Sequence, residues 1–343
     1  MVYKKKIICK LLFASFLIAR TPFEYAFLLS SGYDNNVMRL SSEEFKRANQ
    51  NVDLLGGVEK FDSFVYKIGF KGKKSLWELG KKEFFIKGNI DWANYQHNQY
   101  KKYWSSGLDL TYKWGSFRNI RYSLRHLNNF YLRHYIDRDI STSKLSPCLF
   151  TDHNQKLLIT FLIQKNFWAN FGIGFLQRYY AEPFREFDLD IFYFRFKLSK
   201  KIKKIGSISF QLENGLANSD LNLSDFRPSS FDRSYKTLEW YIPIILKSKL
   251  KILNEFGFSI RNENREYVAE SLNDPLHSGR NHFDTKYDFW VKKDINNTIS
   301  AKFSTRIRRR NTFSEYDWVS DLKSFNQVQV LLKIEWKLIY DKY

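Results

Sequence analysis

The chain has 343 residues, a net charge of +20 and a mean hydropathy of −0.47, yet 18% of its residues are aromatic. A membrane protein built of helices is excluded, because no stretch approaches about 18 uncharged apolar residues. The positive charge alone would suit nucleic acid, but the lysines and arginines are spread along the chain among 36 acidic residues. Since no nucleic-acid-binding motif accompanies them, we expect no nucleic-acid partner.

The N-terminus has the features of a secretory signal peptide. The basic stretch Lys4-Lys5-Lys6 precedes an apolar core from Ile7 to Ala19, which is too short to cross a bilayer. A buried amphipathic helix is the alternative interpretation. Ala19 and Ala26 are both candidate cleavage sites. We assign residues 1–26 to the signal peptide and residues 27–343 to a single domain.

The two cysteines agree with export. Cys9 lies inside the predicted leader, so Cys148 is alone in the mature chain and no intrachain disulfide can form. We interpret Cys148 as an ordinary buried or loop thiol.

From about residue 23 onwards, apolar and polar residues alternate with a period of two, as in strands whose two faces meet different surroundings. In residues 103–114, Trp104, Leu108, Leu110 and Tyr112 share one face. About 14 such segments can be counted, and between about 12 and 16 are compatible with the pattern. They are residues 24–34, 62–71, 83–95, 103–114, 118–130, 154–164, 167–178, 187–198, 205–214, 234–246, 250–261, 282–292, 298–308 and 326–340.

The connections between these segments alternate in length. Short ones are expected at 115–117, 165–166, 199–204, 247–249 and 293–297, with a less regular one near 72–82. Mostly longer ones are expected at 35–61, 96–102, 131–153, 179–186, 215–233, 262–281 and 309–325. Outer-membrane up-and-down barrels have short periplasmic turns and longer outer loops, whereas a soluble β-sandwich gives no reason for the alternation. The sequence therefore predicts an all-β transmembrane up-and-down antiparallel β-barrel with both termini in the periplasm.

The chain resembles poorly characterised porin-like barrels of the bacterial outer membrane, whose mature sequences open with a motif like Ser31-Gly32-Tyr33-Asp34-Asn35-Asn36-Val37. The resemblance implies a Gram-negative cell envelope, contact with outer-membrane lipid and lipopolysaccharide, and insertion by a barrel-assembly machinery that reads an aromatic residue of the last strand. Tyr343 is terminal but out of register with Trp336, Leu338 and Tyr340. Which of these aromatic residues is read stays open.

If the apolar face meets lipid, the polar face lines the lumen. The lumen-lining candidates include Arg121, Arg125, Lys302, Arg306, Arg308, Glu255, Asp288 and Glu335. Cations outnumber carboxylates on this face, which favours weak anion selectivity, although the charges could instead pair across neighbouring strands. Arg308, Arg309 and Arg310 are candidates for binding lipopolysaccharide or an anionic solute through guanidinium–phosphate pairing, and the alternative is a solvated basic loop.

We predict a porin-like channel for passive or weakly anion-selective solute passage, and the alternative is a barrel whose long loops bind or help export a surface partner. A hydrolase is the weakest hypothesis: residues 277–282 hold a serine and two histidines, but adjacency does not make a triad. The other histidines lack metal-site spacing. We expect no catalytic, cofactor-binding or metal site.

Overall fold

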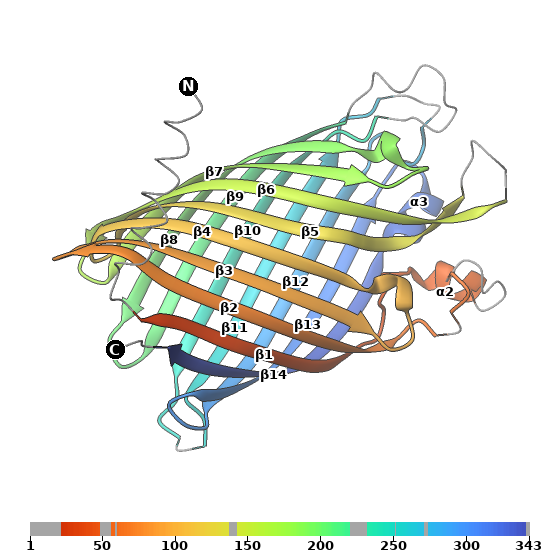
Figure 1. Cartoon of the computed structure of the whole chain (residues 1–343). Helices are drawn as coiled ribbons and strands as arrows, with labels where there is room; N and C mark the ends of the chain where they lie inside the picture. The colour runs from red at the N-terminus through yellow and green to blue at the C-terminus, as the bar shows by residue number, and fades with distance from the viewer. Residues whose placement is uncertain are drawn as a thin grey trace, which may run out of the picture.

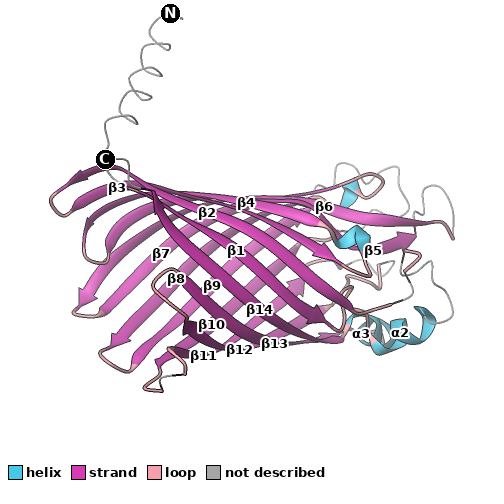
Figure 2. Cartoon of the chain, turned by 60° about the horizontal axis from the view of Figure 1, so that its bottom comes forward, coloured by secondary structure: helices cyan, strands magenta, loops and turns pink. Residues whose placement is uncertain are grey.

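A computed structural model describes residues 22–48, 56–58, 60–136, 143–219, 232–250, 252–270 and 274–340. Within these ranges, 14 antiparallel strands close into a single barrel (Figures 1 and 2). Each strand pairs with its neighbours in the chain, and β1 closes the barrel by pairing with β14. The predicted up-and-down barrel of about 14 strands is confirmed.

The strands are β1 (Phe23–Asp34), β2 (Ser63–Leu79), β3 (Lys82–Tyr95), β4 (Tyr103–Gly115), β5 (Arg118–Ile136), β6 (Leu145–Gln164), β7 (Phe167–Tyr180), β8 (Leu189–Ile202), β9 (Gly206–Ser219), β10 (Tyr235–Lys247), β11 (Glu255–Tyr267), β12 (Asn281–Asp294), β13 (Ile299–Phe313) and β14 (Phe325–Tyr340). Two short helices, α2 (Ser42–Ala48) and α3 (Asp317–Lys323), lie in the connections β1–β2 and β13–β14. The single-turn helices η2 (Gln99–Lys101) and η3 (Arg185–Phe187) lie in the connections β3–β4 and β7–β8.

The two ends of the barrel differ. The turn end, at the left of Figure 1, carries the connections within the pairs β2–β3, β4–β5, β6–β7, β8–β9, β10–β11 and β12–β13, together with the start of β1 and the end of β14. The loop end, at the right, carries the other seven connections, and α2 and α3 lie there in contact with each other. Tight turns need positive φ angles, which Gly80 (60°) and Asn166 (62°) supply.

The predicted turn at residues 247–249 is wrong in extent. The connection occupies 248–254, where the Ser248 amide donates to the Asn254 carbonyl oxygen at 2.9 Å, and β11 begins only at Glu255. Leu250 and Ile252 are 59% and 77% exposed. They continue the alternating pattern of the strands but lie in the turn, so the pattern alone misplaced the strand start.

The predicted boundary at residue 26 falls inside β1. Phe23 is paired with Tyr340 and Ala26 with Lys337, so residues 23–26 belong to the barrel wall. Residues 1–21 of the predicted leader lie outside the described residues, and the cleavage site stays a prediction. No helix in the described part of the chain is both long enough and apolar enough to span a membrane.

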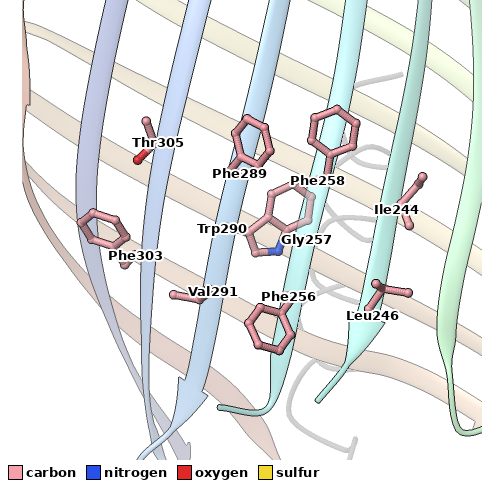
Figure 3. A pocket seen from close by; sticks show the side chains of 10 residues that line it. All are labelled: Ile244, Leu246, Phe256, Gly257, Phe258, Phe289, Trp290, Val291, Phe303 and Thr305. Carbon is pink, nitrogen blue, oxygen red and sulfur yellow. The ribbon is translucent and has the colours of Figure 1, made fainter. Parts of the chain in front are cut away.

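Alternate residues of each strand face opposite sides of the wall. Figure 3 shows a region of β10–β13 where Leu246, Phe256, Phe258, Phe289, Val291 and Phe303 lie side by side. These side chains point outward and together form an apolar surface on the outside of the wall. Between them, Trp290 comes from the inner face and packs flat on Gly257, where an added Cβ would lie 1.7 Å from the indole ring. Glycine at this position therefore allows a large aromatic side chain to lie against the wall.

Candidate functional site: the barrel lumen

The inner face is identified by a chain segment that touches strands far apart in the wall. This segment, Asn36–Phe45 after β1, is named the strap. The Asn36 side chain donates to the Asn326 carbonyl oxygen at the start of β14 (2.9 Å), and Arg133 of β5 donates to the Arg39 carbonyl oxygen (2.9 Å). Arg39 also lies within electrostatic range of Arg308 on β13. The strap therefore reaches across the barrel, and the wall face that bears Arg308 is the inner one.

Local sequence explains how the strap is held. Asn36 also donates to the Leu40 carbonyl oxygen (2.9 Å) and accepts from the Leu40 amide (2.8 Å), which closes a tight loop. Ser41 and Glu44 form a capping box at the start of α2, because each side chain accepts from the backbone amide of the other. Glu44 additionally forms an ion pair with Arg133. The strap is thus fastened both to β14 and to β5.

An apolar cluster supports the same segment. Met38 and Leu40 of the strap pack on Tyr131 of β5, and all three are at least 95% buried. Phe45 and Phe61 pack against this cluster with their rings 4.6 Å apart. Burial of such large side chains supplies most of the stability of an inward-folded segment.

The inner wall near the loop end, named the packed half, holds a buried charge cluster. Asp284 of β12 is 1% exposed and accepts from Arg308 Nε (2.8 Å) and from an Arg310 terminal nitrogen (2.8 Å). Lys286 Nζ lies 3.9 Å from the same carboxylate. Three cations therefore share one carboxylate, which leaves this region positively charged.

The inner wall nearer the turn end, named the open half, is different. Arg125 pairs with Asp109 (2.7 Å) and Arg306 pairs with Asp288 (2.6 Å). The two arginine side chains are 43% and 49% exposed although they point into the barrel. In the part of the chain that the structure describes, protein does not fill the space in front of these arginines, so the two ion pairs meet solvent.

Several cations of the open half have no carboxylate within 4.0 Å among the described residues, and four of them lie on one stretch of the wall, from β3 to β8. The four are Lys87 of β3, Arg121 of β5, Lys156 of β6 and Lys197 of β8. Lys156 and Lys197 both lie within electrostatic range of Arg121 and Arg195. Arg195 is itself paired with Glu213. One side of the lumen therefore carries positive charge that protein carboxylates do not neutralise.

The structure places every predicted lumen residue on the inner face: Arg121, Arg125, Lys302, Arg306, Arg308, Glu255, Asp288 and Glu335. Glu255 accepts from Trp290 Nε1 (3.0 Å), and Lys302 lies 4.5 Å from the centre of that ring. Glu335 lies 3.9 Å from Lys337. Arg309 alternates with its neighbours and points outward, where it donates to Asn311 (3.0 Å). Thus Arg308 and Arg310 share a face that Arg309 does not.

Several residues of the packed half were missed by sequence reasoning, notably Arg39, Glu44, Lys101 and Arg133. Lys101, in η2, donates to the Tyr131 carbonyl oxygen at 2.6 Å and is 4% exposed. One signal was available, because Ser41-x-x-Glu44 is a capping-box pattern that predicts a helix start. Nothing in the sequence indicated the partner of Glu44, which lies 89 positions away.

The two histidines of residues 277–282, the segment considered for catalysis, form hydrogen bonds with residues outside that segment. His277 bonds the Asp274 carboxylate at 2.8 Å, and His282 bonds the Thr312 hydroxyl at 2.8 Å. Burial lowers the pKa of His277 to about 4, so its ring is neutral near neutral pH. Among the described residues, no group of three or more histidine, cysteine and carboxylate side chains is placed to hold a metal ion.

Comparison with known proteins gives similarity in structure only. No protein-family model and no curated protein sequence matches the chain. The outer-membrane channel DcaP of Acinetobacter baumannii is similar with a TM-score of 0.47 at 10% identity, over 92% of this chain and 96% of that one. The Pseudomonas aeruginosa outer-membrane proteins OpdK (TM-score 0.42, 9% identity, 93% and 99% covered) and OprD (0.41, 9%, 93% and 94%) are also similar. At these values the likeness concerns the barrel alone.

Proposed function

We propose that the protein is an outer-membrane channel that passes small solutes and prefers anions. The observation that supports it most is the group of unneutralised cations, Lys87, Arg121, Lys156 and Lys197, beside solvent-exposed ion pairs in the open half. Fixed positive charge in a narrow aqueous space attracts anions and repels cations. The ion pairs of the same half add little to this field, because their charges cancel.

The test is single-channel recording in planar bilayers under a potassium chloride gradient. We expect discrete current steps and a reversal potential that is shifted toward the equilibrium potential of chloride. In Lys156→Ala/Lys197→Ala, the chloride-to-potassium permeability ratio should fall roughly twofold. Lys200→Ala is the matched control, because Lys200 lies on β8 but on the outer face. A folded barrel that carries no current would contradict the proposal and leave partner binding by the loops as the alternative.

We further propose that the turn end faces the periplasm and the loop end faces outward. Short turns and paired terminal strands at one end are the periplasmic features of such barrels. Arg309 would then lie on the outer surface near the loop end, where a guanidinium can pair with lipopolysaccharide phosphate. The barrel-assembly machinery would insert the chain through β14. Protease accessibility of an epitope tag in the connection β9–β10, in intact cells, tests this orientation.

A further inference from the structure

Arg39 is a cation at the inner face that lacks a carboxylate partner. No carboxylate within the described residues lies within 4.0 Å of it, and its Nε is shielded from solvent without a hydrogen-bond acceptor. Burial, together with nearby Arg308 and Arg310, lowers the pKa of Arg39 to about 9. Removing a guanidinium from water without an acceptor costs free energy. An anion that bound here would relieve that cost.

The backbone at Arg39 is specifically arranged. Its φ of 58° lies in the left-handed region, which is costly for a residue other than glycine. The Arg39 amide donates to the Asn36 carbonyl oxygen (3.1 Å), and its own carbonyl oxygen accepts from Arg133 (2.9 Å). The strap therefore holds an unfavourable conformation through contacts on both sides. The backbone at Arg39 is therefore held by hydrogen bonds at both its amide and its carbonyl group.

The surroundings are cationic. Arg308 and Arg310 both donate hydrogen bonds to Asp284. Each also has a terminal nitrogen that has no protein acceptor among the described residues. Lys101 is also within electrostatic range of Arg39 and Arg308. The second nearby carboxylate, Asp34, already accepts from Gln327 and Gln329 (2.9 and 2.7 Å). The cations around Arg39 therefore outnumber the carboxylates near them.

We propose that Arg39 of the strap, together with Arg308 and Arg310, forms an oxyanion-binding site at the inner face of the barrel. Guanidinium groups suit this role because their planar N–H forks match the oxygens of phosphate or carboxylate. The inference rests on the proposed channel and deepens it, since an anion passing through the lumen would meet this site under the strap. Asp284 holds two of the guanidiniums in position, and the strap supplies the third.

Isothermal titration calorimetry of the folded full-length protein in detergent tests the site without requiring conduction. Inorganic phosphate is the probe, and acetate in a second series separates phosphate from carboxylate recognition. We expect phosphate to bind the wild type and the affinity to fall at least tenfold in Arg39→Ala, with partial recovery in Arg39→Lys. Arg185→Ala is the matched control, because this arginine lies in η3, away from the site, and pairs with Glu182 at 2.9 Å while 65% of its side chain is exposed, and it should bind like the wild type.

Heat modifiability on gels establishes that each variant forms a closed barrel. If Arg39→Ala does not fold, Arg310→Ala replaces it with the same expectation. Equal affinity in Arg39→Ala and the wild type, or no binding of either anion by the wild type, would overturn the site. Absence of single-channel current together with Arg39-dependent binding would refute the channel but retain the site.

Discussion

The open and packed halves of the lumen use the same residue types in opposite ways. In the open half, Arg306 pairs with Asp288 while 49% of its side chain stays exposed. In the packed half, Arg308, two positions further along the same strand, pairs with Asp284 and is only 10% exposed. Arg308 also lies 5.3 Å from the centre of the Phe325 ring and within electrostatic range of Arg39 of the strap, whereas Arg306 stays half exposed. An arginine–aspartate pair is therefore a solvated wall feature in one half and a buried structural element in the other.

This comparison predicts a large difference in stability between two equivalent substitutions. Asp284→Ala leaves two buried guanidiniums without their carboxylate, so the free energy of unfolding should fall by about 3–5 kcal/mol. Asp288→Ala breaks a pair whose arginine is half exposed and removes the acceptor of the Ser259 hydroxyl (3.3 Å), so it should lower the free energy of unfolding by only about 1 kcal/mol. Urea unfolding of both variants in lipid vesicles, followed by tryptophan fluorescence, measures the two values. Equal losses would show that burial does not separate the halves.

Removal of the Glu44 carboxylate should release the strap from Arg133 of β5. Among the described residues, Glu44→Ala leaves Arg133 with only the Met38 and Arg39 carbonyl oxygens as acceptors. We expect a loss of about 1–3 kcal/mol in unfolding free energy, and a larger, noisier single-channel current because the lumen widens under the strap. Lys46→Ala is the control, since Lys46 lies on α2 but makes an exposed pair with Glu43. An unchanged current in Glu44→Ala would mean that the strap does not limit conduction.

The packed half should also give the channel a pH dependence. Burial, with Arg133 and Arg280 nearby, lowers the pKa of Lys323 in α3 to about 7, while Glu44 and Tyr267 oppose this shift. Lys323 therefore loses its positive charge as the pH rises through about 7. Anion preference measured from reversal potentials should be greater at about pH 6 than at about pH 8. Lys323→Met should reduce this difference, and a variant that retains the full pH dependence would assign the titration to another group.

The two halves also differ in how far the sequence predicts them. The wall was predictable, because a period of two and alternating connection lengths are local patterns that a barrel requires. Residues 306–310 show the limit. The predicted strand ended at 308, but β13 continues to Phe313, so Arg308 and Arg310 turn inward and Arg309 outward. Because the strand is longer than predicted, Arg308 and Arg310 belong to the inner wall and not to a solvated basic loop.

The strap could not be predicted in the same way. Its contacts join residues far apart in the sequence, such as Asn36 with Asn326 at a separation of 290 positions and Glu44 with Arg133 at 89. No local period encodes such pairs, since each depends on closure of the barrel bringing β1, β5 and β14 around one lumen. The capping box at Ser41 and Glu44 indicates a helix but not the direction in which it folds.

The smallest effect on selectivity and stability is expected for a double substitution that leaves the net charge of the open half unchanged. Exchanging the charges of one exposed pair, as Asp288→Arg with Arg306→Asp, keeps the sum of charges and the cross-strand position of both groups. Because the pair is solvated and compact, its field at the lumen axis is weak, so permeability ratio and stability should stay close to wild type. Reversal potentials and urea unfolding check both. A marked change in selectivity would show that the orientation of a neutral pair matters, and that excess charge alone does not set the preference for anions.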